Sequence, residues 1–309
     1  MVKIAFLIIA HTDVEELLRL CAKLKHYGDA YVHVDKKTDN DFMYKLRNGL
    51  SSMSGIFSTY IIKDRINVAW AGYSVMDCED ILLEHALKSN ANYDRFFFLS
   101  GLDYVLYSPK KLQQFCEDNV DKEFLRVYNI TESNRHDLLI RIKYYHFFRD
   151  IPLPARSFLR RAIIGGGKLL LIALGVRRKP YFFVNGKKWD VYVGSQWVGL
   201  TRLCAEFVLD QLKTNTEAIK YFKTTYGPDE LIIPTIIMNS YFARKEYLSK
   251  NGTFNELAHL HYLNYEGYMH SYDESDFDTL MNSGKLFVRK FVSDKSEKLI
   301  ELVDNVTRC

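Results

Sequence analysis

Hydrophobic and polar residues follow two different periods along the first half of the chain. Short apolar runs predict β-strands, and longer segments with apolar residues three or four positions apart predict amphipathic helices. The segment Val14–Tyr27, for example, places Leu17, Cys21 and Leu24 on one helical face. The predicted strands are Lys3–Ala10, Ala30–Val34, Ile56–Ile62 and Arg95–Leu99, and the predicted helices are Val14–Tyr27, Phe42–Leu50, Val75–Lys88 and Pro109–Glu117.

Strands that alternate with helices in this way indicate an α/β fold, with a mostly parallel central sheet flanked by helices. In such sheets, ligands bind beyond the carboxyl ends of the strands. His11, Asp35 and the turn Ser100–Tyr104 each follow a predicted strand directly. We therefore expect these three features to lie together at one edge of the sheet.

The second half has a less regular order of elements. An aromatic-rich segment, Lys143–Arg149, leads into a proline-containing break, and strand-like sequence resumes at Tyr181. No boundary has the composition of a flexible linker, so 1–309 is predicted to be a single domain. The elements predicted here are a helix over Thr201–Leu212, a buried helix after Glu230, strands at Ala258–Leu263 and Leu286–Phe291, and a C-terminal helix over Lys295–Val306.

An acidic pair, Asp229 and Glu230, stands directly before the apolar run 231–238. The preceding Gly227 and Pro228 predict a turn into the first turn of a helix, where the helix dipole stabilises negative charge. An ionised carboxylate in that place has the state that a general base needs. Helix capping is the commoner use of such a pair, because acidic residues often occupy first helical turns.

Composition narrows the classes of function. The chain has 309 residues, 48% hydrophobic content and a net charge of +4, which suits one large core and does not indicate nucleic acid binding. The 5 cysteines are scattered without a CxxC pair, and Cys21, Cys78 and Cys204 are expected to be core residues of a reduced, cytosolic protein. The sequence lacks a convincing signal peptide, a membrane-spanning stretch, a Walker A loop, a dinucleotide fingerprint, HExxH and GxSxG.

Candidate metal ligands are few. The Asp-x-Asp sequences at 39–41 and 276–278 match the letters used by metal-dependent nucleotide-sugar transferases, but both lie in polar helix-start or loop sequence. His259 and His261 share a face of a predicted strand without a convincing third ligand, which favours a structural role over metal binding. No metal site is therefore predicted.

Two cations, Arg289 and Lys290, lie within the strand-like apolar run 286–291. Both are good partners for phosphate, Arg as a planar fork and Lys as a point charge. The alternative is that they protect an edge strand from aggregation, which would explain one cation more easily than two. The pair is thus a candidate counter-charge for a diphosphate.

The segment 156–179 has an apolar centre with basic residues at both ends. A short apolar segment of this kind can lie in the interface of an anionic membrane. A surface-packed helix with solvated basic ends is the alternative, and the three consecutive glycines at 165–167 lower its helix propensity.

Six short motifs occur in an order that resembles the core-2/I-branching β-1,6-N-acetylglucosaminyltransferase family, which includes the peptide O-xylosyltransferases. Each motif alone is weak, whereas six in order from about Ile4 to Phe291 are a strong signal. The motifs are His33–Lys37, Val68–Ser74, Leu99–Tyr104, Gly194–Trp197, Gly227–Glu230 and Leu286–Phe291.

The resemblance implies a GT-A-type nucleotide-sugar transferase fold and an inverting mechanism without a required metal or other cofactor. It implies a nucleotide-binding half at about 1–128 and an acceptor-side, catalytic half at about 129–309. It also implies site residues, with Glu230 as general base and Ile9, His11, Asp35 and Lys290 around UDP. We add Trp70 and Arg289 as candidate contacts of UDP, and Asp103, Gln196, Trp197 and Asp229 as candidate contacts of the sugars.

The sequence departs from the family in places that shape the prediction. The family's second phosphate-binding Arg has no counterpart around 266–270, so Arg289 or His270 is expected to compensate. Gln196 stands where the xylosyltransferases have Asp. With no membrane anchor or disulfide framework, the chain resembles a bacterial, cytosolic relative, peripheral on the inner membrane face, that acts on a glycan or lipid-linked glycan.

Two other functions remain open at the level of sequence. A glycan-binding module would use the abundant aromatic residues as platforms for sugars. A sugar nucleotidyltransferase would need a glycine-rich basic loop after the first strand, where this chain has Ala10-His11-Thr12-Asp13. The donor sugar also stays open, with N-acetylglucosamine, xylose and other hexoses as candidates.

Overall fold

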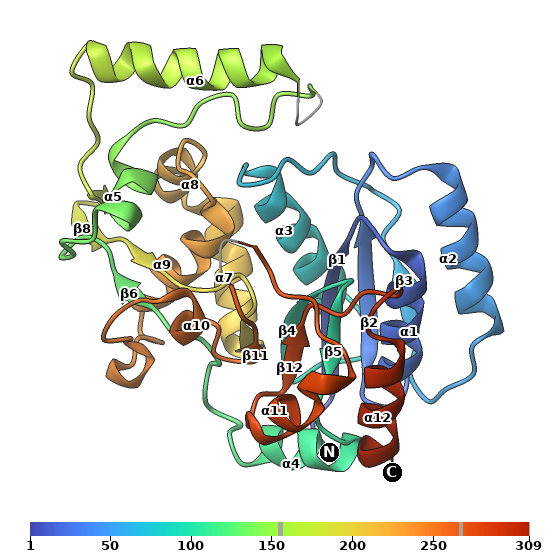
Figure 1. Ribbon diagram of the computed structural model, residues 1–309. Coiled ribbons are helices and arrows are strands. Elements are labelled where there is room, and N and C mark those ends of the chain that lie inside the picture. Colours follow the sequence, from blue (N-terminus) through green and yellow to red (C-terminus); the bar gives the residue numbers. More distant parts are fainter. Residues whose placement is uncertain (154–156, 266–267, 309) are drawn as a thin grey trace.

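A five-stranded sheet forms the centre of the molecule (Figure 1). The structure is a computed structural model that describes residues 1–153, 157–265 and 268–308. Across the sheet the strands are β10 (Gly199–Thr201), β4 (Arg95–Ser100), β1 (Ile4–Ala10), β2 (Asp29–Val34) and β3 (Thr59–Ile61). All are parallel except β10, which runs antiparallel to β4. The predicted α/β fold with a mostly parallel sheet is confirmed.

Helices cover both faces of this sheet, as the alternation predicted. On one face lie α1 (Val14–Leu24) and α2 (Asn40–Ser52), and on the other lie α3 (Ser74–Leu87) and α7 (Arg202–Thr214). Because successive side chains of a strand point to opposite faces, β1 contributes Phe6 and Ile8 to the first core and Ala5 and Leu7 to the second.

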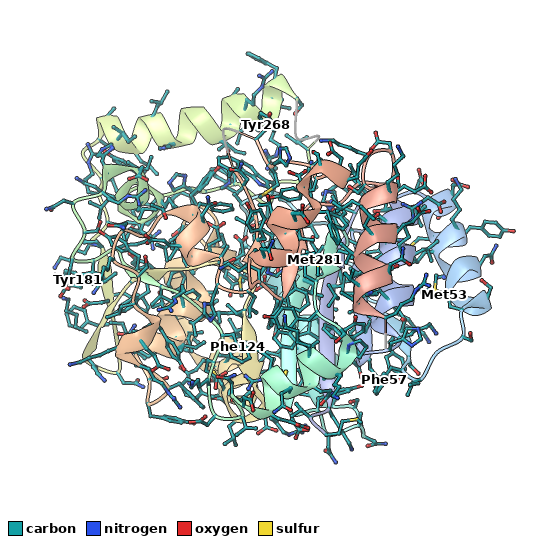
Figure 2. The ribbon with its side chains drawn as sticks, turned by 60° about the horizontal axis from the view of Figure 1, so that its bottom comes forward. Met53, Phe57, Phe124, Tyr181, Tyr268 and Met281 are labelled. Atoms are coloured by element: carbon teal, nitrogen blue, oxygen red, sulfur yellow. The ribbon has the colours of Figure 1, made fainter. Side chains whose placement is uncertain are left out.

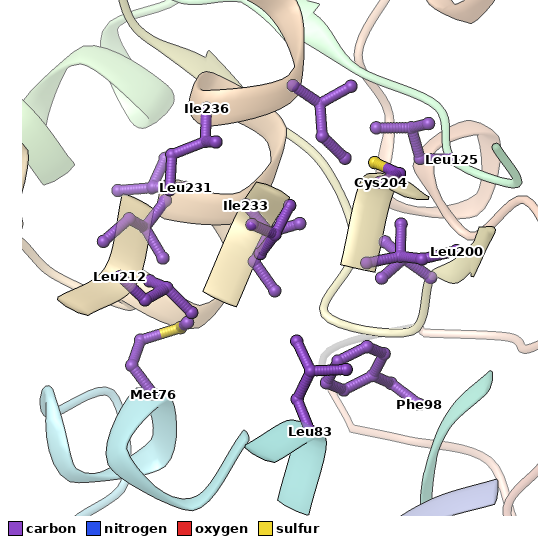
Figure 3. Close-up of a cluster of buried hydrophobic side chains, with 14 of the residues drawn as sticks. Met76, Leu83, Phe98, Leu125, Leu200, Cys204, Leu212, Leu231, Ile233 and Ile236 are labelled. Carbon is purple, nitrogen blue, oxygen red and sulfur yellow. The ribbon is translucent and has the colours of Figure 1, made fainter. Parts of the chain in front are cut away.

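The core on the α3 side continues into the second half of the chain. It includes α9 (Ile232–Met238), whose Ile233 and Ile236 lie with Met76 and Leu83 of α3 in one apolar cluster (Figure 3). The helix that follows the acidic pair is therefore packed against the first half of the chain. Cys204 of α7 belongs to the same core and, like Cys21, Cys78 and Cys116, is a free thiol.

A second sheet of three strands adjoins the first. Its order is β11 (His261–Tyr262), β12 (Phe287–Arg289) and β5 (Asp103–Val105). β12 pairs with β5 so that Arg289 stands opposite Asp103. The elements around this sheet are α4 (Pro109–Glu117), η3 (Glu274–Asp276), α11 (Phe277–Asn282) and α12 (Glu297–Thr307).

The remaining elements lie on the α5 side of Figure 1 and are short. Two pairs of short strands, β6 with β9 and β7 with β8, are antiparallel. These elements are β6 (Tyr128–Asn129), α5 (His136–Lys143), β7 (Tyr181–Val184), β8 (Lys187–Asp190), β9 (Tyr192–Val193), α8 (Thr216–Phe222), η1 (Pro228–Glu230), η2 (Lys245–Tyr247) and α10 (Phe254–Leu257).

One helix, α6 (Phe158–Ala173), lies apart from the two sheets at the top of Figure 1. None of its residues is buried, and the helix continues through the three glycines that argued against it. In Figure 2, side chains on its far side extend away from the rest of the protein. Within the described chain, no helix combines the length and apolar character that a bilayer crossing requires.

Several predicted elements have different bounds in the structure; the strand predicted over 258–263, for example, is only β11. The strand predicted over 56–62 is only β3, because this edge strand pairs with β2 over three positions. The strand predicted over 286–291 stops at Arg289. Asp229 and Glu230 lie in the separate 3-10 turn η1 rather than in the first turn of α9, since Leu231, with φ −117°, interrupts the helical geometry between them.

Candidate active site

The carboxyl ends of β1 and β2 bring His11 and Asp35 to the same edge. Residues of the two strands pair in register up to Ala10 and Val34, and the Asp35 N–H donates to the Ala10 carbonyl at 2.9 Å. The buried Asp35 carboxylate accepts from the Lys37 N–H at 2.9 Å and lies 3.0 Å from the Lys37 ammonium. It is thus a fixed acceptor at the strand end, as the order of elements predicted.

His11 lies at the surface of this edge. Desolvation by the surrounding protein lowers the pKa of His11, and the positive charge of Arg289 lowers it further, against the opposing effect of Asp35. Arg289 comes from β12, so a charge from the second sheet acts on a residue at the edge of the first. A ring that stays neutral can accept or donate a hydrogen bond without adding charge to the site.

Asp103 is the centre of a buried charge cluster. Its carboxylate accepts from the Ser100 N–H and hydroxyl, both at 2.7 Å, and lies 3.1 Å from His261 Nε2 and 3.0 Å from Arg289 Nη1. Burial alone would raise the pKa of Asp103, but the charge and hydrogen bond of His261, together with Arg289 and the Ser100 N–H, lower it. Asp103 is fully buried, so its contacts here are with protein groups.

Trp197 extends this cluster toward the second half of the chain. Its ring lies 5.3 Å from the His261 ring, and the Arg289 guanidinium lies 5.1 Å from its centroid. The indole N–H and Arg289 Nε are buried without a hydrogen-bond partner among the described residues. Lys290 follows Arg289 directly and has no ion-pair partner in the described part of the chain, so its charge is available to a ligand.

The turn that carries Glu230 is held by one arginine of α5, Arg141. Its Nη2 lies 2.8 Å from Glu230 Oε2 and donates to the Gly227 carbonyl at 3.0 Å, while its Nε donates to the Tyr226 carbonyl at 3.2 Å. Gly227 has φ +64°, a left-handed conformation that favours glycine. The Glu230 side chain keeps 27% of its surface exposed, and its Oε1 bonds to no described residue.

Asp229 points into the protein instead. Burial first, and then the charge of Glu230, raise the pKa of Asp229 to about 7, against the opposing charge of Arg141. Behind it, on α3, Glu79 is also buried, with neither carboxyl oxygen bonded among the described residues, and burial raises its pKa well above the usual range. The two members of the acidic pair therefore have different environments. Glu230 is partly exposed to solvent, whereas Asp229 faces the core.

Two backbone hydrogen bonds join the parts of the site. The Gly194 N–H donates to the Glu230 carbonyl at 2.8 Å, and the Gly227 N–H donates to the Ala71 carbonyl at 3.2 Å. A Cβ at Gly194 would lie 2.9 Å from the Arg126 carbonyl oxygen, so only glycine allows this approach. The segment with Gln196 and Trp197 and the loop with Trp70 are both fixed to the turn of Glu230.

Trp70 lies on the side of the site that carries Glu230. The residue is 75% exposed, and its ring meets the ring of Tyr226 edge-on, with centroids 5.7 Å apart. The Arg149 guanidinium lies 4.5 Å from the Tyr226 centroid. An exposed indole beside the turn of the acidic pair can stack on a sugar ring or a base.

Comparison with known proteins identifies the family. Residues 4–280 match the family model described as Core-2/I-Branching enzyme. The chain belongs to this family. It is also 25% identical to a xylosyltransferase of Ciona intestinalis over 245 residues, which cover 77% of this chain and 25% of that protein. The chain thus spans about a quarter of the length of the relative.

Solved structures of two glycosyltransferases resemble this Core-2/I-Branching family member more distantly. Core-mannan synthase A of Aspergillus fumigatus, in its Mn/GDP form, has a TM-score of 0.38 at 11% identity, covering 80% of this chain and 72% of its own. Mouse xyloside xylosyltransferase 1 has a TM-score of 0.35 at 10% identity, covering 79% of this chain and 84% of its own.

Several residues of this Core-2/I-Branching site were not predicted from the sequence. Arg141 stands between two isoleucines in an ordinary amphipathic segment, which contains no signal for its pairing with Glu230. His261 was assigned a structural role, and the structure adds its contact with Asp103. Glu79 is the third residue that was not predicted. Its position on the apolar face of a helix was the one feature of the sequence that could have indicated a buried carboxyl group.

The Asp-x-Asp sequences lie away from strand ends, as predicted. Asp39 caps α2 by accepting from the Phe42 N–H at 2.8 Å, and Asp41 pairs with Lys45 at 2.9 Å. Asp276 belongs to the capping box of η3. Among the described residues, no group of three or more His, Cys, Asp or Glu side chains could hold a metal ion.

Proposed function

We propose that this protein is an inverting glycosyltransferase that moves a sugar from a UDP-sugar to a hydroxyl of a glycan or lipid-linked glycan, with Glu230 as general base and without a metal. One observation carries the proposal. The Glu230 carboxylate is held by Arg141 on one oxygen, while Oε1 has no hydrogen-bond partner among the described residues and the side chain is 27% exposed, in a turn that is tied to both sides of the site. This is the geometry of an oriented base.

The donor would bind along the edge formed by the first half. Asp35 provides a fixed acceptor for an N–H of the uracil, with Ile9 and His11 beside the uridine. Lys290 and Arg289 supply the positive charge that a diphosphate needs. Asp103 acts as a positioning residue, because its carboxylate holds the Arg289 guanidinium against the Trp197 ring.

The reaction is a single displacement. Glu230 accepts the proton of the acceptor hydroxyl while the hydroxyl oxygen forms a bond to the anomeric carbon. The bond between that carbon and the diphosphate oxygen breaks, UDP leaves with the bonding electrons, and an α-linked donor yields a β-linked product. Lys290 and Arg289 stabilise the charge that develops on the leaving diphosphate. We assign contacts with the sugar rings to the exposed Trp70 and to Gln196, whereas the buried Trp197 acts through the Arg289 guanidinium that lies over its ring.

The cellular setting belongs to the same proposal. The four described cysteines are free and buried, as expected in a reducing compartment. UDP-sugars, the proposed donors, are present in the cytoplasm. We place the protein on the cytoplasmic side, and the described residues 157–179 would reach lipid-linked acceptors at the membrane.

The test begins with a panel of UDP-sugars: N-acetylglucosamine, xylose, glucose and galactose donors, each with and without EDTA. Thermal shift identifies the donor, and release of UDP reports turnover. Glu230→Gln should bind UDP like the wild type and lose about 10²–10⁴-fold in turnover, the usual contribution of a general base. Glu301→Gln, an exposed carboxylate on α12, is the matched control and should stay active.

Each part of the proposal has its own contrary outcome. Turnover near the wild-type value in Glu230→Gln would reject the base, and loss of turnover in EDTA would reject the metal-independent mechanism. A protein that binds glycans but no UDP-sugar would be a glycan-binding module. Formation of a UDP-sugar from UTP and a sugar phosphate would indicate a nucleotidyltransferase.

A further inference from the structure

Helix α6 presents an apolar face to solvent rather than to the protein. We define its outer face as Phe158, Leu159, Leu169, Leu170 and Leu174, whose residues are 81%, 57%, 67%, 61% and 68% exposed. A helix on the surface of a soluble protein normally turns its apolar stripe toward the core and its charged residues outward. The outer face of α6 therefore lacks the partner that its composition requires.

The charges of residues 157–179 indicate which kind of partner would bind the outer face. Residues 157–179 contain Arg160, Arg161, Lys168 and the run Arg177–Lys179, and they contain no acidic residue. Arg178 is buried against Thr224 and is not available, whereas the others are half-buried or exposed. An apolar face with basic residues at both ends is complementary to a membrane surface that carries anionic lipids.

The inner side of α6 is attached to the protein. Arg160 Nη2 donates to the Arg149 carbonyl at 2.8 Å, and the charges of Lys168 and Arg177 lie 5.6 and 4.9 Å from the ring of Tyr144. At the far end, Arg178 donates to the Thr224 carbonyl at 2.9 Å. The helix is therefore held at both ends, and its outer face has a defined direction.

This attachment leads directly to the catalytic turn. Arg149, whose carbonyl holds the start of α6, places its guanidinium 4.5 Å from the Tyr226 ring, and Tyr226 directly precedes Gly227 of the turn that carries Glu230. The exposed Trp70 ring packs against the same Tyr226. A surface that binds the outer face of α6 is therefore close to the edge that carries the proposed base.

We propose that α6 docks in the plane of an anionic membrane and holds the active-site edge beside the bilayer, so that the acceptor is an amphiphile with a sugar head group and a lipid tail. With 16 residues, α6 is too short to cross the hydrocarbon core and can only lie along it. The choice of acceptor rests on the proposed function, whereas the docking surface does not.

The first experiment measures co-sedimentation of the full chain with vesicles of phosphatidylcholine alone or mixed with phosphatidylglycerol. Wild type should bind the anionic vesicles at least about ten-fold more strongly, and high salt should weaken the binding. Leu159→Gln/Leu169→Gln/Leu170→Gln should lose binding to a similar extent. The control Val120→Gln/Leu203→Gln/Val306→Gln, which changes exposed apolar residues elsewhere, should bind like wild type.

Several results would overturn docking. Equal binding by wild type and the outer-face variant would do so, as would absence of binding to anionic vesicles at low salt. If α6 instead pairs with a second copy of the chain, light scattering would show that wild type is a dimer and that the outer-face variant is a monomer. In that case neither protein would bind vesicles, and docking would be refuted. UDP affinity, measured for every variant, reports separately on the proposed enzyme function.

The orientation has its own readout in Trp70, which is exposed while Trp189 and Trp197 are buried. Lipids with a spin label on the head group should quench the tryptophan fluorescence of vesicle-bound protein. Trp70→Phe should remove most of the quenching without reducing vesicle binding. Bound protein whose fluorescence is not quenched would refute the placement of the active-site edge beside the bilayer.

Discussion

Replacing Asp229 by Asn should change how the stability of the protein depends on pH. Burial and the charge of Glu230 raise the pKa of Asp229 to about 7, against an ordinary value of about 3.9. The folded protein therefore keeps a proton that the unfolded chain releases. Stability from this group is fully present below about pH 4 and is lost as the pH rises to about 7.

The magnitude follows from the two pKa values. A rise from about 3.9 to about 7 corresponds to ~4 kcal/mol of unfolding free energy once both states are ionised. Between about pH 5 and pH 8 the loss amounts to about 2–3 kcal/mol. Asp229→Asn has no proton to lose, so its stability relative to wild type should increase by that amount over this interval.

The assay is urea unfolding of wild type and variant at both pH values. The quantity of interest is the change with pH of the difference between the two proteins, because the packing cost of Asn is the same at each pH and cancels. Asp64→Asn, the same change at an exposed carboxylate, should leave that difference constant within about 0.5 kcal/mol. A constant difference for Asp229→Asn as well would refute the assignment of a buried, destabilised carboxylate.

Three further outcomes are expected. Arg141→Gln should lower turnover about 10²-fold with little change in UDP affinity, because Glu230 loses the group that orients it; unchanged turnover would contradict this role. Gly194→Ala should lower the unfolding free energy by about 1–3 kcal/mol, since the new Cβ would meet a backbone oxygen at 2.9 Å, and urea unfolding would measure it. Arg289→Lys should weaken UDP binding about ten-fold by calorimetry, since the compact ammonium cannot contact both Asp103 and the diphosphate as the planar guanidinium can; equal affinity would argue against contact with the diphosphate.

Elements with strong local signals were predicted closely. The helix over Pro109–Glu117 has the predicted bounds, because Ser108 caps it and proline starts it, both within one turn of the chain. The alternation along β4 likewise sends Phe96 and Phe98 to one core and Phe97 to the other. Such features depend on residues that are close in the sequence, so they can be predicted from one sequence alone.

The candidate site was predicted in part for the same reason. His11 and Asp35 follow strands, and the carboxyl ends of neighbouring parallel strands share one edge, so their proximity could be inferred without a structure. Glu230 was singled out by its turn and by the family motif. Arg141 was not, because its pairing with Glu230 joins residues from separate elements, and nothing in the local sequence of α5 marks it.

The sequence by itself determined the main strands and helices of the first half, and therefore which polar residues stand at the ends of those strands. The tertiary structure alone decided which charges meet: Arg141 with Glu230, and Arg289 with Asp103. It also decided that the apolar side of α6 faces outward. The physical reason is that periodicity and capping act over a few residues, whereas ion pairs and burial depend on elements that pack together from distant parts of the chain.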